Sequence, residues 1–208
     1  MAAFDLPPYG LNAELGVPGI QELPFQGVYR LSDDGLSLYF CDYLGPRPGG
    51  IGGTDLWVAT RASVSDPWGT PTNLGPPVNT TYDEIGMSIW AVGCVLLVSS
   101  NRPGGLGDWD IWLTTRPAQD AEWREPVDLG LPLNSASAEG ETSISGDGST
   151  IYFWSYRSGG SGRSVIWQVS TTPVVDLNGD WIVDSADLCI MVDNWHTDNT
   201  LCDIAPLH

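Results

Sequence analysis

The 208-residue sequence contains no lysine, and its eight basic residues are all arginine, against 26 acidic residues. The formal net charge of −18 repels phosphate groups, which argues against binding to nucleic acid and to anionic membranes. No apolar run reaches the roughly 18 residues that a transmembrane helix needs. We therefore expect no nucleic-acid partner and no transmembrane segment.

Histidine and cysteine are also scarce. The two histidines are His196 and His208, so the earlier part of the chain lacks the side chain that histidine triads and histidine-ligated zinc require. Four cysteines are too few for a disulfide scaffold. Cys189 and Cys202 are close enough in sequence to form one disulfide, which would need an oxidising compartment. Cys41 and Cys94 are expected to be buried thiols at opposite ends of equivalent strands.

The start of the chain, MAAFDLPPYGLNAEL, has neither the basic segment nor the apolar segment of a signal peptide. Two interpretations follow: the protein is cytoplasmic, or the chain begins downstream of the natural start.

A repeat with a period of 55 residues dominates the sequence. The stretch 101–116 repeats the stretch 46–61, and a third copy surrounds Arg157. The 25 glycines and 16 prolines separate about four short β-segments per unit. For the first complete unit these segments are 27–31, 37–41, 55–60 and 71–79. A fixed period of this size predicts a mainly β repeat protein with units at about 28–83, 84–138 and 139–172, after a partial N-terminal unit.

The recurring cores, LSDDGLSLYF with ISGDGSTIYF and PRPGGIGGTDLW with NRPGGLGDWDIW, resemble the WD40-like (PD40-type) β-propeller repeats of bacterial envelope and secreted proteins. The resemblance covers about residues 12–172 and implies three to four four-stranded blades, an incomplete propeller. Closed propellers have four to eight blades. We therefore expect either a fragment of a longer protein, the favoured interpretation, or pairing with a second copy.

Most recurring polar residues are predicted to hold the repeats together. Arg47, Arg102 and Arg157 recur in each unit and are expected to lie over tryptophan rings. Glu84 and Glu139 could be considered the carboxylate pair of a glycoside hydrolase. Their repeat-equivalent positions predict identical environments, whereas an acid and a base need different ones.

Trp109 and Trp154 do not recur, and these are the candidate exposed contacts for a ligand. Their aromatic rings would suit stacking on carbohydrate.

The segment 173–208 has a different composition and contains a candidate calcium loop. Oxygen donors stand at the positions that a 12-residue calcium loop uses, the seventh through its backbone carbonyl: Asp176, Asn178, Asp180, Ile182, Asp184 and Asp187. A helix is expected to start near Ser185.

This loop resembles the first half of a dockerin type I module, which implies bound calcium and a cohesin-like partner. The sequence departs from that pattern at position 6, where Trp181 replaces glycine, and at Ala186, one of the partner-recognition positions. It also contains one loop where dockerins carry two.

Together these features predict a non-catalytic, secreted or cell-surface binding protein, extracellular or in the cell envelope. Its repeats would bind a glycan or protein, and its calcium-dependent C-terminal module would attach it. Two alternatives remain: a carbohydrate-active enzyme, either a glycoside hydrolase or a lyase, and a purely structural envelope protein. Fold alone does not separate them.

Overall fold

The computed structural model describes residues 29–32, 34–42, 47–90, 93–145, 149–157 and 164–170. Within these ranges the chain is all β, with eleven strands. The candidate calcium loop, the helix expected near Ser185 and the Cys189–Cys202 pair lie outside the described residues.

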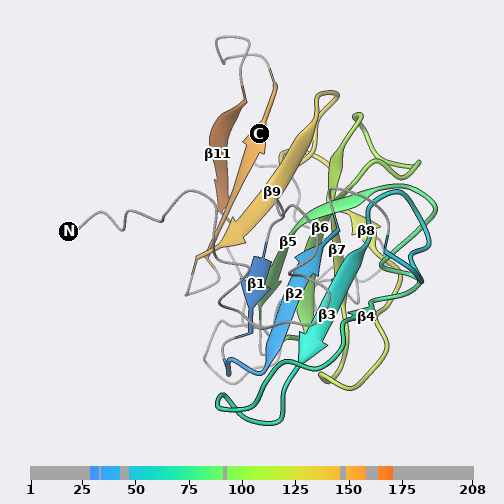
Figure 1. Cartoon of the computed structure of the whole chain (residues 1–208). Coiled ribbons are helices and arrows are strands. Elements are labelled where there is room, and N and C mark those ends of the chain that lie inside the picture. The colour runs from blue at the N-terminus through green and yellow to red at the C-terminus, as the bar shows by residue number, and fades with distance from the viewer. Residues whose placement is uncertain are drawn as a thin grey trace.

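The strands form three antiparallel sheets in chain order (Figure 1). The first sheet contains β1 (Tyr29–Leu31), β2 (Ser37–Cys41), β3 (Leu56–Thr60) and β4 (Thr72–Asn73). The second sheet contains β5 (Glu84–Trp90), β6 (Val95–Ser100), β7 (Asp110–Thr115) and β8 (Val127–Asp128). The third sheet contains β9 (Glu139–Ile144), β10 (Thr150–Ser155) and β11 (Val165–Ser170).

The strands predicted for the first complete unit agree with β1 to β4, with one difference. The fourth segment, predicted as extended over 71–79, contributes a strand of only two residues, Thr72–Asn73. The chain turns directly afterwards because Gly75 adopts a positive φ of 68°, which favours glycine.

The 55-residue period is preserved in the strand register. Val95 pairs with Thr115 in the second sheet, and Thr150 pairs with Ser170 at the equivalent position of the third. The first strand of each of these sheets also carries an irregularity in its pairing at equivalent places. Sequence repetition therefore corresponds to a repeated three-dimensional frame.

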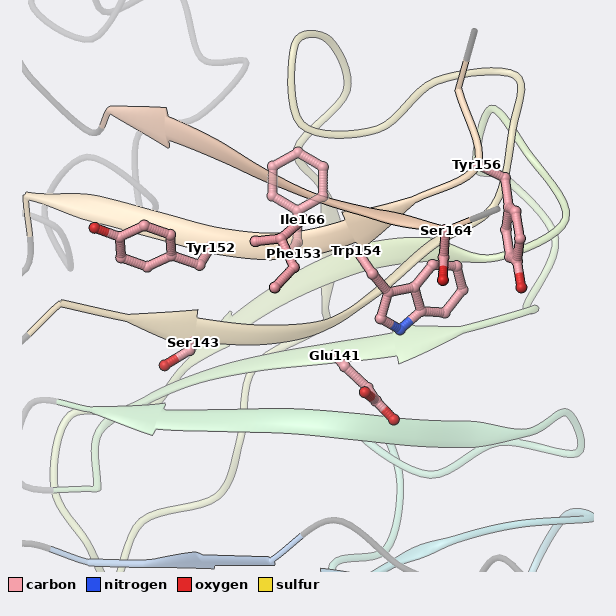
Figure 2. A pocket seen from close by; sticks show the side chains of 8 residues that line it. All are labelled: Glu141, Ser143, Tyr152, Phe153, Trp154, Tyr156, Ser164 and Ile166. Atoms are coloured by element: carbon pink, nitrogen blue, oxygen red, sulfur yellow. The ribbon is translucent and has the colours of Figure 1, made fainter. Parts of the chain in front are cut away.

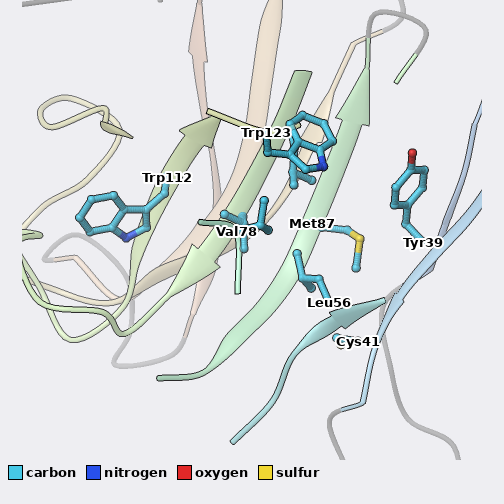
Figure 3. Close-up of a cluster of buried hydrophobic side chains, with 9 residues drawn as sticks. Tyr39, Cys41, Leu56, Val78, Met87, Trp112 and Trp123 are labelled. Atoms are coloured by element: carbon cyan, nitrogen blue, oxygen red, sulfur yellow. The ribbon is translucent and has the colours of Figure 1, made fainter. Parts of the chain in front are cut away.

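Each sheet packs one face on the next sheet. The core between the first and second sheets joins Tyr39, Cys41 and Leu56 to Met87 and Trp112, as Figure 3 shows. These side chains alternate with others along their strands, as the two-residue periodicity of a strand requires. Fully burying a residue such as Leu56 contributes roughly 1.5–3 kcal/mol, so this interface is a main source of stability.

The core between the second and third sheets follows the same pattern. Leu97 and Leu113 of the second sheet pack with Ile151 and Phe153 of the third. On β10, the neighbouring residues of opposite parity point to the other face. That face of the third sheet is open: Tyr152 is 40% exposed, whereas its repeat equivalent Leu97 is 1% exposed.

Candidate functional site

Glu84 and Glu139 begin the first strands of the second and third sheets, and both are fully buried. The Glu84 carboxylate accepts hydrogen bonds from the Thr80 hydroxyl at 2.6 Å and amide at 2.9 Å, and from the Ser100 hydroxyl at 3.0 Å. The Arg102 guanidinium lies 3.2 Å from the same carboxylate. A buried carboxylate with this many partners is fixed in place.

Glu139 repeats this environment group by group. Ser135 donates from its hydroxyl at 2.7 Å and its amide at 2.9 Å, Ser155 donates at 2.6 Å, and Arg157 lies at 3.3 Å. The predicted equivalence of the two glutamates is confirmed. Because the two environments match, they provide no division into a general acid and a general base.

Burial raises the pKa of the Glu84 carboxyl, and this effect outweighs the lowering by the Thr80 hydrogen bonds and the Arg102 charge. The Arg102 guanidinium also donates to the carbonyls of Pro77 at 3.3 Å and Val78 at 2.5 Å. Arg102 therefore ties the end of one unit to the start of the next, a structural task.

The predicted stacking of the repeated arginines on tryptophan is confirmed. The guanidinium carbon of Arg102 lies 5.4 Å from the ring centroid of Trp112, and that of Arg157 lies 5.1 Å from Trp167. Arg47 lies 5.4 Å from Trp57 in the first sheet. Cation–π contacts of this kind each contribute about 0.5–2 kcal/mol.

The first sheet holds its arginine differently, which the sequence analysis missed. Asp42 stands where the second sheet has Ser100, and Tyr29, which pairs with Phe40, stands where the second sheet has Met87. Asp42 accepts the Arg47 amide at 3.0 Å and the Trp57 indole N–H at 3.1 Å. The available clue was that an acidic residue precedes each arginine in the sequence. However, the two glutamates and Asp42 stand at different sequence distances from their arginines.

A pocket of about 480 Å³ lies on the open face of the third sheet, well within the size range of ligand sites. Its lining combines aromatic rings with hydroxyl groups and one carboxylate (Figure 2): Glu141, Ser143, Tyr152, Phe153, Trp154, Tyr156, Ser164 and Ile166. Trp154, Tyr156 and Ser164 gather at one end of the pocket, and Tyr152 and Ser143 lie towards the other.

Trp154 and Tyr156 form two walls of the pocket at a steep angle. Their ring centroids are 5.4 Å apart, and the ring planes meet at 73°. Such an edge-to-face arrangement is a favoured geometry for aromatic pairs and fixes both rings. Tyr156 is 56% exposed, so its ring is available to a ligand.

The position of Trp154 depends on Gly140, its partner across the sheet. A Cβ atom at Gly140 would lie 2.7 Å from Cζ2 of the indole, closer than carbon atoms can approach. In the second sheet the equivalent pair is Ile85 and Ser99. In the second sheet the larger residue, Ile85, lies on the first strand, whereas in the third sheet the larger residue, Trp154, lies on the second strand. This exchange turns a large aromatic ring toward the open face.

Glu141 occupies a position that favours glycine. Its φ is 45°, and the equivalent residue of the second sheet is Gly86 with φ 43°. Both lie at the pairing irregularity, a β-bulge, of their first strands. The Glu141 amide donates to the Ser99 hydroxyl at 3.1 Å, which holds the strained residue against the second sheet.

The positive charge of Arg30, on β1, interacts with the negative charge of Glu141. Its guanidinium donates to the carbonyls of Tyr29 at 2.8 Å and Thr142 at 3.2 Å. Burial lowers the pKa of Arg30, and the Glu141 carboxylate acts in the opposite direction. Arg30 is not among the described residues that line the pocket.

The two candidate tryptophans are not brought together. Trp154 lines the pocket, whereas Trp109 is half-buried and its carbonyl accepts the Glu139 amide at 2.9 Å. The repeat equivalent of Trp109 is Ser164, which does line the pocket. Sequence reasoning missed Tyr152, Tyr156 and Glu141; the alternation in IYFWSY was the clue to the two tyrosines.

The remaining predicted sites are only partly covered by the structure. Cys41, the last residue of β2, is a buried thiol, as expected, whereas Cys94, just before β6, is a thiol that is only half-buried. The six predicted calcium ligands and the Cys189–Cys202 pair lie outside the described residues. Within the ranges that are described, no group of three or more histidine, cysteine or acidic side chains is arranged to hold a metal ion.

The same described ranges contain no helix long and apolar enough to cross a membrane. No protein-family model matches the sequence, and no curated protein matches it. The repeats, the calcium-loop sequence and the pocket are therefore the features that bear on function.

Proposed function

We propose that this chain is a WD40-like β-propeller repeat protein that binds a ligand without transforming it. The repeated sheets, each packed face to face on the next, are what blades of an incomplete propeller would look like. The observation that carries the binding function is the aromatic pocket on the third sheet. Exposed aromatic rings beside a few polar groups are the usual composition of a recognition site.

The arrangement of the carboxylates favours binding over catalysis. Glu84 and Glu139 are both buried in ion pairs within the frame. Among the described residues that line the pocket, Glu141 is the one carboxylate. Glycoside hydrolysis commonly requires two carboxyl groups across the scissile bond, which makes an enzyme the weaker alternative.

The ligand of this pocket would be a glycan or a segment of another protein. Trp154 and the two tyrosines could stack on either, and the serines could hydrogen-bond to either. The alternative of a purely structural envelope protein gives no reason for exposed aromatic rings around a pocket.

Attachment would be the task of segment 173–208. Its loop, Asp176 to Asp187, carries the donor spacing of a dockerin-type calcium site. A calcium-dependent tether fits an extracellular or cell-envelope protein, where calcium is plentiful, and a cohesin-like domain would be the corresponding partner.

The binding function is tested on the whole chain with arrays of neutral oligosaccharides and of acidic and basic peptides. Binding that Trp154→Ala abolishes and that Tyr82→Ala retains supports the proposal, since Tyr82 is an exposed aromatic residue outside the pocket. Absence of binding, or binding indifferent to Trp154, contradicts it. Turnover of glycosides by the wild type would favour the enzyme.

The calcium proposal is tested separately by calorimetric titration of the whole chain with calcium. Heat of binding that disappears in Asp187→Ala supports a site at this loop. Equal heats in both proteins, or none in the wild type, would exclude it.

A further inference from the structure

We infer that the pocket of the third sheet recognises the guanidinium group of an arginine presented by a basic partner protein. This inference rests on the proposed binding function and names the chemistry of the ligand. It combines the geometry of Trp154 and Tyr156, the strained position of Glu141 and the charge of the chain.

In the described part of the chain, guanidinium groups already lie on tryptophan rings at five places. The distances from guanidinium carbon to ring centroid run from 4.2 Å to 5.4 Å. Arginine is well suited to this contact because its planar, weakly hydrated cation stacks on aromatic faces. Trp154 presents the same kind of ring, now in an open pocket.

The pocket adds the two features that a cation site needs besides one ring. Tyr156 stands at 73° to Trp154 and forms a second aromatic wall. The Glu141 carboxylate lies on the same side of the pocket, as Figure 2 shows. Two aromatic walls and a carboxylate together favour a cation with a delocalised charge.

Glu141 is the residue that most clearly points to a ligand. It adopts a φ of 45°, at the position where the second sheet has Gly86. A side chain in this region of backbone space is strained, and such strain is concentrated at binding sites. The bulge directs the Glu141 side chain toward the pocket, and the second sheet forms the same bulge with a glycine.

The charge of the whole chain is complementary to a basic partner. A net charge of −18 attracts cations and raises their local concentration at the surface. Burial lowers the pKa of Arg30 and the Glu141 charge opposes this effect, while the carbonyls of Tyr29 and Thr142 hold the Arg30 guanidinium. It lies outside the lining, so it leaves the aromatic walls open to a ligand.

Another β-sheet is the competing occupant, since the equivalent face of the second sheet is covered by the third. Two residues argue against it. Gln168 stands opposite Tyr152 where the second sheet has the pair Leu97–Leu113, and Glu141 replaces Gly86. Covering this face would bury an amide and a charge, which costs free energy unless both are paired.

The test is a calorimetric titration of the whole chain with two capped tripeptides, Gly-Arg-Gly and Gly-citrulline-Gly. Citrulline has the shape of arginine without its charge. We expect the arginine peptide to bind at least about tenfold more tightly, with binding weakened by salt. Glu141→Gln should weaken the arginine peptide about tenfold, Trp154→Ala at least as much, and Tyr82→Ala not at all.

Several results would overturn this inference. One is equal affinity for both peptides or no binding of either; another is full binding by Glu141→Gln. Trp154-dependent binding of a neutral oligosaccharide would overturn the arginine assignment while supporting the proposed function. A dimer in solution that Ile166→Asp dissociates would show that a second copy covers the face. Thermal melts of each variant establish that losses of binding do not reflect unfolding.

Discussion

The second and third sheets share one frame and differ in what one face presents. Both begin with a buried glutamate paired to an arginine, and both hold that arginine over tryptophan. The second sheet covers its face with Leu97 and Ile111, which the next sheet buries. The third sheet presents Tyr152 and Ile166 at the same positions, 40% and 81% exposed.

Repeated residues and unrepeated residues therefore perform different tasks in this protein. The repeated ones satisfy each other's charges and hydrogen bonds inside the frame. The unrepeated ones gather around the pocket, where a strained glutamate and a large ring replace a glycine and a serine. The residues that differ between the two sheets are therefore the candidates for the binding function.

The largest effect is expected from breaking the shared frame. Glu84→Ala removes the carboxylate and leaves Arg102 partly buried without it, which should cost about 3–5 kcal/mol of unfolding free energy in urea. Glu139→Ala should cost somewhat less, because the Arg157 side chain is 18% exposed against 9% for Arg102.

Glu122→Ala, at an exposed position, serves as the control. A loss below about 1 kcal/mol for both buried glutamates would mean that the ion pairs do not stabilise the frame.

The exchange of large and small residues can be tested by a double-mutant cycle. Gly140→Ala should destabilise the protein by about 2 kcal/mol, because the new Cβ meets the Trp154 ring. In a Trp154→Ser background, which restores the serine of the second sheet, the cost of Gly140→Ala should fall to a few tenths of a kcal/mol. Additive effects in urea unfolding would contradict the contact.

Glu141→Gly makes the third sheet more like the second at the bulge. Relief of the positive φ is expected to stabilise the fold by about 1 kcal/mol. The same substitution should remove arginine-peptide binding. Glu141→Ala is the matched control, since it removes the carboxylate but keeps the strain. Equal stability of the two variants would argue that no strain is stored there.

The smallest effect concerns Asp110, for which the third sheet has Val165. Burial raises the pKa of Asp110, and the negative charges of Asp128 and Glu139 raise it further. One of the Asp110 carboxylate oxygens is buried without a hydrogen-bond partner. Because the folded-state pKa is raised, its contribution to stability is complete below the ordinary value of 3.8 and is lost as the pH rises through the folded-state pKa.

Relative to Asp110→Asn, the wild type should therefore gain stability as the pH falls from about 7 to about 4. At neutral pH the two should differ by less than about 1 kcal/mol in urea unfolding. A wild-type advantage that grows with rising pH would reverse the expected sign.

The sequence predicted the frame well because repetition makes each residue's role visible more than once. The four strands of the first unit, the arginine–tryptophan contacts and the equivalence of Glu84 and Glu139 followed from the 55-residue offset. Asp42 was missed because the first unit shifts to a 58-residue offset there, which makes Asp42 equivalent to Ser100 rather than to Leu97.

The pocket could be predicted only in part. Trp154 was identified because it does not recur. The exposure of Tyr152 depends on whether another sheet covers it, which a strand pattern does not show. The role of Glu141 depends on a positive φ at a bulge, and a glutamate gives no sign of that conformation. The calcium loop stays a prediction from donor spacing.

Whether the unrepeated residues of the third sheet bind the ligand is tested by comparing the wild type with a variant whose pocket face is rebuilt on the pattern of the second sheet. Glu141→Gly and Trp154→Ser are combined, and the urea midpoint and the calorimetric affinity for the Gly-Arg-Gly peptide are measured on the same samples. We predict a folded variant with an intact cooperative transition and no detectable binding. Binding equal to that of the wild type, or no binding by the wild type itself, would contradict the account.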